Sequence, residues 1–304
     1  MVRSAYETIE LGSHQHSDRC DLRWLCDKSH LDRAAKPKMK NELEMVLRSR
    51  KSLTDSVARQ QITALSDFCS GLMRPDKCSE VDPIRTPFDP AEISEPIKWL
   101  AQPFGEFFYQ KGRPIQVSGQ MWNLDRGPDF RFRAPLFTNK WTGQFEGRWA
   151  RKVGLDKVEE FVLEMFRLTS SDFGLLTTEV DLKAKNTAPP IVSFMGLDPE
   201  QGVPGLYWIN LFSDQYAKWL GLRQLSKELA VQDELPGGGV RLKFCGLPDE
   251  CRSLEVLQKQ RSAIDWLGPQ RFFDNRFPDR KQEAPDWTSL PLPGNEQSNI
   301  SINI

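Results

Sequence analysis

The chain has 304 residues, of which 41 are Lys or Arg and 42 are Asp or Glu, so its formal net charge at pH 7 is −1. A nearly neutral chain has no overall field that would draw it to nucleic acid or to an anionic membrane. Hydrophobic residues make up 39% and charged residues 27%, as in ordinary globular proteins rather than disordered or membrane proteins. We therefore expect a chain that folds in water, in one large domain or two smaller ones.

The first residues, the apolar runs and the cysteines of the chain indicate its cellular compartment. Residues 1–20 contain charges and histidines in place of the uninterrupted apolar stretch of a signal peptide. No later run approaches the roughly 18 consecutive apolar residues of a transmembrane helix. The six cysteines do not form the repeating framework of a small secreted domain: Cys20, Cys26, Cys69, Cys78, Cys245 and Cys251. These observations predict a cytoplasmic protein with reduced thiols and no membrane partner.

Potential zinc ligands are concentrated near the start of the chain, at His14, His16, Cys20, Cys26 and His30. Imidazole and thiolate are the ligands that zinc prefers, so these side chains could close a tetrahedral site. The spacing is not a standard one, however, and the paired C-x2-C motif is missing. We favour a solvated, partly disordered N-terminus without metal and keep a zinc-organised adaptor as an alternative.

A domain boundary is predicted near residue 80, because the proline-rich stretch PIRTPFDPAEISEP, typical of a linker, begins at residue 83. The segment Asn41–Met73 before it is rich in helix formers. Its apolar residues form two stripes that are separated by a shift near Thr54: Leu43, Val46 and Leu47, then Leu65, Phe68 and Leu72. We expect an N-terminal extension, residues 1–80, that is partly disordered and then helical. Its helices are candidates for a contact between copies of the chain.

The middle of the chain alternates strand and helix patterns. Apolar and polar side chains alternate in short pieces between Pro114 and Trp149, which predicts half-buried strands. Leu155–Leu168 has the i, i+3, i+4, i+7 spacing of an amphipathic helix. A short helix over Thr178–Asn186 follows, with Thr177 or Thr178 as its cap.

The last third continues this alternation. The run GLYWINLF at 205–212 predicts a strand that is buried on both faces, in the centre of a sheet. A helix over Ser213–Gly221 and a strand over GGGVRLKFCG at 237–246 follow, and the final helix ends at Gly268. The tail after Trp287 is polar, and we expect it to be frayed. The order of elements predicts an α+β domain over residues 81–304, with an antiparallel or mixed central sheet covered by helices.

The composition argues against catalysis. No histidine follows His30, so the rest of the chain has no imidazole base for a serine or cysteine nucleophile. We therefore predict no enzyme, no cofactor and no metal. One alternative stays open, because Asp125, Asp129 and Glu146 could perform acid–base chemistry or bind a metal ion without histidine. Surface ion pairs along exposed strands are the interpretation we favour for these three residues.

Several residues are candidates for a protein interface. Trp122 with Arg126, Arg131 and Arg133 has the composition of an interface hot spot on a loop. Acidic candidates lie in two proline-containing loops, Asp198 with Glu200 and Asp249 with Glu250. We expect no nucleic-acid partner, because the basic stretch around residues 36–51 is interrupted by glutamates and has no base-stacking aromatic residues.

Four segments resemble, in order, the bacterial immunity proteins that accompany polymorphic toxins of type VI secretion or contact-dependent systems. They are GLLTTEVDLKAKN at 174–186, VPGLYWINLFSDQYAKWLG at 203–221, ELPGGGVRLKF at 234–244 and LGPQRFFDNRFPDRKQEAPDW at 267–287. The resemblance implies that the chain binds a cognate toxin stoichiometrically and protects the cell that produces it. It supplies no active-site residues, and it implies that Tyr207, Trp208 and Asn210 hold the central strand while Gly238 shapes a turn.

Overall fold

The computed structural model describes residues 42–125, 137–186, 202–274, 282–287 and 289–290. The chain divides into two units, Met1–Met39 and Lys40–Ile304, and all the described residues belong to the second. Its strands are β1 (Leu43–Ser49), β2 (Lys77–Ser79), β3 (Thr86–Pro87), β4 (Glu106–Lys111), β5 (Val117–Asn123), β6 (Asn139–Phe145), β7 (Phe173–Thr178), β8 (Ile209–Phe212), β9 (Val231–Glu234) and β10 (Val240–Lys243). Its helices are α2 (Asp55–Gly71), α3 (Ser94–Ala101), α4 (Gly147–Val153), α5 (Leu155–Leu168), α6 (Glu179–Asn186), α7 (Asp214–Leu220) and α8 (Leu254–Leu267), with the short 3₁₀ turns η3 (Leu222–Gln224), η4 (Pro248–Arg252) and η5 (Pro269–Arg271).

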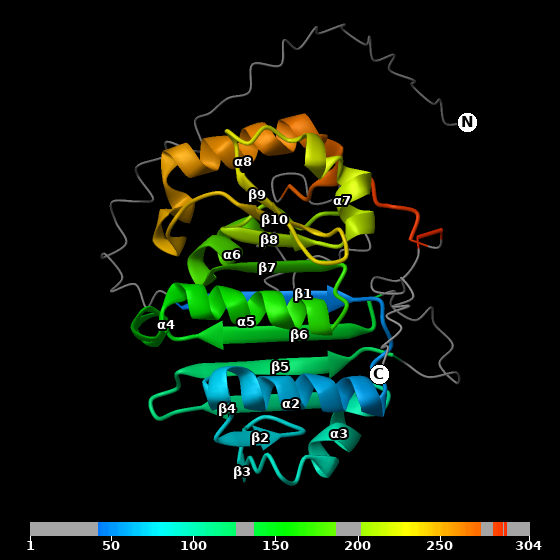
Figure 1. Cartoon of the computed structure of the whole chain (residues 1–304), viewed down its shortest axis with the longest axis vertical. Coiled ribbons are helices and arrows are strands. Elements are labelled where there is room, and N and C mark those ends of the chain that lie inside the picture. Colours follow the sequence, from blue (N-terminus) through cyan, green and yellow to red (C-terminus); the bar gives the residue numbers. More distant parts are fainter. Residues whose placement is uncertain (1–41, 126–136, 187–201, 275–281, 288, 291–304) are drawn as a thin grey trace, which may run out of the picture. The chain divides into compact units, whose positions relative to one another are not determined.

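The ten strands form one sheet in the order β3-β2-β4-β5-β6-β1-β7-β8-β10-β9, and every neighbouring pair is antiparallel. Figure 1 shows α2 and α5 on one side of this sheet, with their axes running along the strands. The predicted α+β class with an antiparallel central sheet is therefore confirmed. None of the described helices is both long enough and apolar enough to cross a bilayer.

The two sides of the sheet bury two separate hydrophobic clusters, because side chains along a strand alternate between its faces. Helices α2 and α5 cover the first cluster, in which Met45, Trp141 and Phe161 pack together. The second cluster lies under α7 and α8 and contains Phe212 and Val240. The apolar stripe of α5 predicted from its spacing is confirmed, because all its members are buried: Val158, Phe161, Val162, Met165 and Phe166.

Strand β1 corrects the prediction of a helix over its residues. It lies between β6 and β7, with Leu43 opposite both Phe145 and Thr178. Its apolar residues Leu43, Met45 and Leu47 alternate with Glu44, Val46 and Arg48, and this period of two decides the structure once partners are present. Strands β1 and β2 belong to the same sheet as the later strands, and the division of the chain falls at residues 39–40 rather than near residue 80.

The other predicted elements agree well with the structure. Thr54 begins α2 by accepting a hydrogen bond from the Val57 backbone, and Thr178 does the same for Asp181 in α6. Ser213 caps α7 at its start, and Gly221 ends it in the left-handed conformation. The run at 205–212 is a strand only from Ile209, and β4 and α4 are additional elements.

A buried ion pair fastens the C-terminal segment to the sheet. The guanidinium of Arg50 donates to Asp172 from Nη2 to Oδ1 at 2.9 Å and from Nε to Oδ2 at 3.1 Å. The same guanidinium donates to the carbonyl oxygens of Trp287 and Leu290, and it lies over the Trp287 ring at 5.0 Å. Burial raises the pKa of Asp172, and the hydrogen bond from Arg50 opposes this shift.

Candidate functional site

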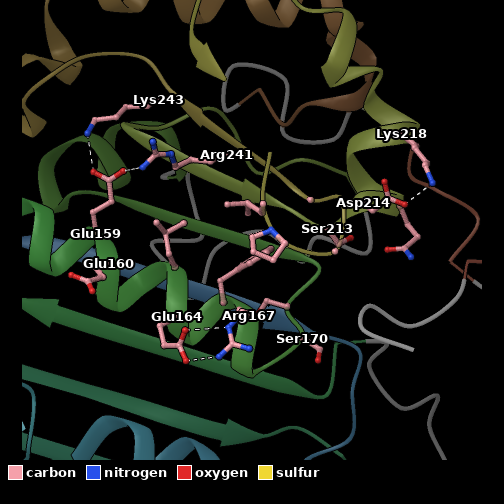
Figure 2. A pocket seen from close by; sticks show the side chains of 18 of the residues that line it. Glu159, Glu160, Glu164, Arg167, Ser170, Ser213, Asp214, Lys218, Arg241 and Lys243 are labelled. Atoms are coloured by element: carbon pink, nitrogen blue, oxygen red, sulfur yellow. Dashed lines mark hydrogen bonds and ion pairs between the residues drawn. The ribbon is translucent and has the colours of Figure 1, made fainter. Parts of the chain in front are cut away.

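A groove with a volume of about 1390 Å³ lies beside α5, on the sheet face that α2 and α5 cover (Figure 2). Its walls are α5, the start of α7 and the turn between β9 and β10, and strand β10 contributes to its floor. Apolar side chains lie among its charged residues: Phe68, Leu163, Phe166, Trp219, Leu235, Pro236 and Leu290. The groove is therefore amphipathic, like the surfaces that proteins use to bind other molecules.

Strand β10 supplies the cations of the groove because its side chains alternate between two environments. Val240 and Leu242 are fully buried in the cluster under α7 and α8. Arg241 and Lys243 point to the opposite face, where they line the groove beside α5. A strand over these residues was predicted, and its outward side is the part that reaches the groove.

Glu159 on α5 is the centre of a charged network in the groove. Its carboxylate accepts from the guanidinium of Arg241 and, at 2.8 Å, from the Lys243 ammonium. Arg241 also donates from Nε to Asp233 on β9 at 2.9 Å. The Lys243 ammonium lies 5.3 Å from the centre of the Trp208 ring, a cation–π contact. These bonds join α5 to the outer strands of the sheet.

A second charged group lies at the start of α7. Asp214 accepts from Lys218 at 2.5 Å and from Arg223 at 3.1 Å. Gly238 has a φ of +81°, and a Cβ atom there would lie 2.9 Å from Oδ1 of Asp214. Glycine therefore permits both the backbone conformation and the close approach of the β9–β10 turn to Asp214. The triple glycine forms a turn before a strand, as predicted.

Several polar side chains of the groove are engaged in hydrogen bonds or ion pairs within the fold. Two of its hydroxyls are engaged within the fold, since Ser213 caps α7 and Ser171 hydrogen bonds to Thr169. On its outer wall, Glu164 pairs with Arg167 at 2.6 Å, and both side chains are substantially exposed. The groove thus presents charges of both signs that a partner could contact.

Trp122 lies on the opposite face of the sheet and is not displayed on a loop, so that part of the prediction is wrong. It belongs to β5 and is only 7% exposed, because the Lys140 side chain of β6 lies over it, with Nζ 4.1 Å from the ring centre. Burial, together with the nearby charge of Arg48, lowers the pKa of Lys140 to about 6. The predicted partners Arg126, Arg131 and Arg133 lie outside the described residues.

Glu44 on β1 lies on the same face as Lys140, and sequence reasoning missed it. Its carboxylate accepts from the Gln144 amide at 2.9 Å, and the same amide donates to Glu42 at 2.8 Å. Burial raises the pKa of Glu44 to about 8, in spite of the hydrogen bond from Gln144. The signal was the alternation in LEMVLRS, which places Glu44 on a strand inside the sheet.

The predicted contact residues Asp249 and Glu250 do not line the groove. Asp249 and Glu250 belong to η4, where Asp249 pairs with Arg151 at 3.4 Å and Glu250 accepts from the Leu247 backbone at 3.1 Å. Asp198 and Glu200 lie outside the described residues. The groove itself was not predicted, because it is formed by segments that are distant in sequence.

Asp125 and Glu146, the two described carboxylates of the enzyme alternative, do not converge. Asp125 follows the end of β5, whereas Glu146 follows β6 at the opposite end of the same strand pair. A strand of this length separates them by about 20 Å. Glu146 caps α4 by accepting from the Trp149 backbone at 2.6 Å, and Asp129 lies outside the described residues. Within the described ranges, no group of three or more His, Cys, Asp or Glu side chains could hold a metal ion.

The N-terminal zinc alternative falls on residues that the structure does not describe. His14, His16, Cys20, Cys26 and His30 all precede residue 42, where the description begins. The zinc-organised adaptor therefore stays a prediction.

Comparison with known proteins adds a structural likeness. No family model and no curated protein matches the chain. The solved structure of the Pseudomonas aeruginosa T6SS protein PA0821 is similar, with a TM-score of 0.51 and 10% sequence identity. The match covers 78% of this chain and 86% of that one. At this identity the likeness shows a shared fold.

Proposed function

We propose that this chain is an immunity protein of a type VI secretion system, which binds a toxin in the cytoplasm of the producing cell and neutralises it without catalysis. The amphipathic groove beside α5 carries the proposal, because it combines fixed charges of both signs with apolar side chains. The shared fold with a T6SS protein and the four resembling segments support the same assignment. Neutralisation by tight binding would typically bury about 1,600 Å² at the interface.

The groove is the proposed toxin-binding surface, and its two walls supply the contacts. Glu164 and Arg167 are exposed on α5, and Lys218 is exposed on α7 across the groove (Figure 2). All three side chains stand on helices, so little conformational entropy of the backbone is lost when a partner binds. A toxin surface with complementary charges would exchange these intramolecular pairs for intermolecular ones.

Co-expression tests the proposed function directly. The protein encoded by the neighbouring gene is produced in a bacterium with and without this full chain, and survival is measured. We expect the chain to restore growth and to co-purify with that protein in a fixed ratio. Continued killing despite soluble expression of the chain would contradict the proposal.

Matched charge reversals test the binding surface separately. We expect Glu164→Lys and Lys218→Glu to weaken the complex by roughly tenfold or more, since interface charges typically contribute about 1–3 kcal/mol. The controls are Glu95→Lys, from the i,i+3 pair with Lys98 on α3, and Lys259→Glu, from the i,i+4 pair with Glu255 on α8. Affinity is measured by calorimetry. Equal losses in the groove and control variants would place the toxin elsewhere on the surface.

A further inference from the structure

Two thiols lie in contact just beyond the end of β10. The Sγ atoms of Cys245 and Cys251 are 3.8 Å apart, and the chain between them is the short turn that leads into η4. A disulfide requires about 2.05 Å between the sulfurs, so they need to approach by less than 2 Å. Among the four cysteines that the structure describes, this is the pair joined by a hydrogen bond.

The two thiols differ in exposure, and this difference assigns them separate roles. Cys245 is partly exposed and donates to the Leu247 carbonyl at 3.3 Å, beside the exposed Leu247 side chain. Cys251 is fully buried in the cluster under α2 and α5. The hydrogen bond between the thiols lowers the pKa of Cys245 and raises that of Cys251, where burial adds to the increase. Small oxidants therefore reach Cys245 first, and in its more reactive form.

We propose that Cys245 and Cys251 form a peroxide-oxidised dithiol site, with Cys245 as the attacking thiol and Cys251 as the resolving thiol. The Cys245 thiolate attacks one oxygen of hydrogen peroxide, the O–O bond breaks, and hydroxide leaves. The buried Cys251 thiol then attacks the sulfur of the resulting sulfenic acid, an S–S bond forms, and water leaves. Two thiols and one peroxide give one disulfide and two waters. A small-molecule dithiol reverses the step.

The site adjoins the groove through the backbone. The carbonyl oxygen of Cys245 accepts from Nε1 of Trp208 at 3.0 Å, and Trp208 in turn lies against Lys243 of the Glu159 network. The proposal rests on the thiols alone and does not depend on toxin binding. The disulfide would link η4 covalently to the end of β10.

Peptide mapping of the full chain tests the proposal. Trypsin cleaves after Lys243 and Arg252, so both cysteines fall in the one peptide FCGLPDECR. After brief treatment with hydrogen peroxide and blocking with iodoacetamide, we expect this peptide to lose two hydrogens and to resist alkylation until it is reduced. Its oxidation should run on the order of tenfold faster than that of the exposed Cys69. A peptide that stays fully alkylated while Cys69 is oxidised would overturn the proposal.

Single variants separate the two roles. In Cys251→Ser, Cys245 should still react, and the peptide should gain oxygen because the resolving thiol is missing. In Cys245→Ser, the buried Cys251 should stay reduced, as should Cys78, which is also buried. Circular dichroism confirms that each variant is folded. A disulfide between Cys245 and any other cysteine in the wild-type chain would also overturn the assignment.

Discussion

Two carboxylates bound by arginine, Asp172 and Glu159, occupy opposite environments in this protein. Asp172 is fully buried, and its partner Arg50 is covered by Trp287. Glu159 is bound by Arg241 and Lys243, whose side chains remain 22% and 23% exposed in the groove. The comparison teaches that similar ion pairs serve different purposes here. The sealed pair holds the C-terminal segment in place, whereas the open network leaves its cations within reach of a partner.

The largest expected effect comes from breaking the sealed pair. We expect Arg50→Met to lower the free energy of unfolding by about 3–5 kcal/mol, because it leaves the buried Asp172 carboxylate without its cation. Urea denaturation measures the change. The matched control Arg261→Met removes an exposed cation that lies 3.1 Å from Asp265, and it should change stability by less than about 0.5 kcal/mol. Similar losses in the two variants would remove the distinction between sealed and exposed pairs.

Glu44 extends the comparison to a carboxylate whose hydrogen bond comes from an amide. Its pKa is raised to about 8 in the folded protein, so the folded state retains a proton that the unfolded state releases above pH 4.5. Its contribution to stability is therefore present at acidic pH and is lost as the pH rises toward 8. We expect Glu44→Gln to remove this decline, with a gain of about 2 kcal/mol at pH 9 relative to pH 5.

Thermal unfolding across this pH range measures the Glu44 effect. Glu95→Gln, at an exposed site on α3, is the control and should leave the pH profile close to that of the wild type. A Glu44→Gln profile that still declines in parallel with the wild type would show that another group causes the decline.

Glu159→Gln tests the open network. We expect a loss of about 1–2 kcal/mol in the free energy of unfolding, because the amide keeps a hydrogen-bond acceptor but no longer neutralises Arg241 and Lys243. Urea denaturation provides the value, and co-purification with the toxin provides a second readout. A loss as large as that of Arg50→Met would mean that the groove network contributes as much to stability as the buried Arg50–Asp172 pair.

The smallest expected effect is a difference in stability between alanine variants at two neighbouring glycines at the rim of the groove. Gly237 and Gly238 have φ values of +82° and +81°, so alanine strains the backbone similarly at both positions. An added Cβ meets Asp214 only at position 238, since nothing lies within 4 Å at position 237. We expect Gly238→Ala to be less stable than Gly237→Ala by about 0.5 kcal/mol. Equal melting temperatures would argue against the close contact with Asp214.

Local patterns predicted much of the fold. The spacing in Leu155–Leu168 predicted the whole of α5, and Ser213 with Gly221 predicted both ends of α7. These signals are strong because one face of each helix is buried and its caps are side chains close in sequence. The prediction of a helix over the residues of β1 was wrong. These residues are helix formers, but they also alternate between apolar and polar, and pairing with β6 and β7 favours the strand.

The groove could not be predicted in the same way. Glu159 meets Arg241 and Lys243 only after the sheet has brought α5 beside β10. Trp122 shows the opposite error, because a tryptophan beside turn residues was expected at the surface and is in fact covered by Lys140. In both places the partner is remote in sequence, so the side chain alone does not reveal its surroundings.

The position of β1 also has a consequence for how the protein is made. Ribosomes synthesise β1 before every other described strand, yet its two neighbours, β6 and β7, are translated much later. Strand β1 therefore cannot pair with β7 until the chain has been synthesised past Thr178. Until then the apolar side chains of β1 lack this partner. Long-range pairing of this kind generally slows folding, and it leaves apolar surface of the nascent chain exposed until β7 has been synthesised.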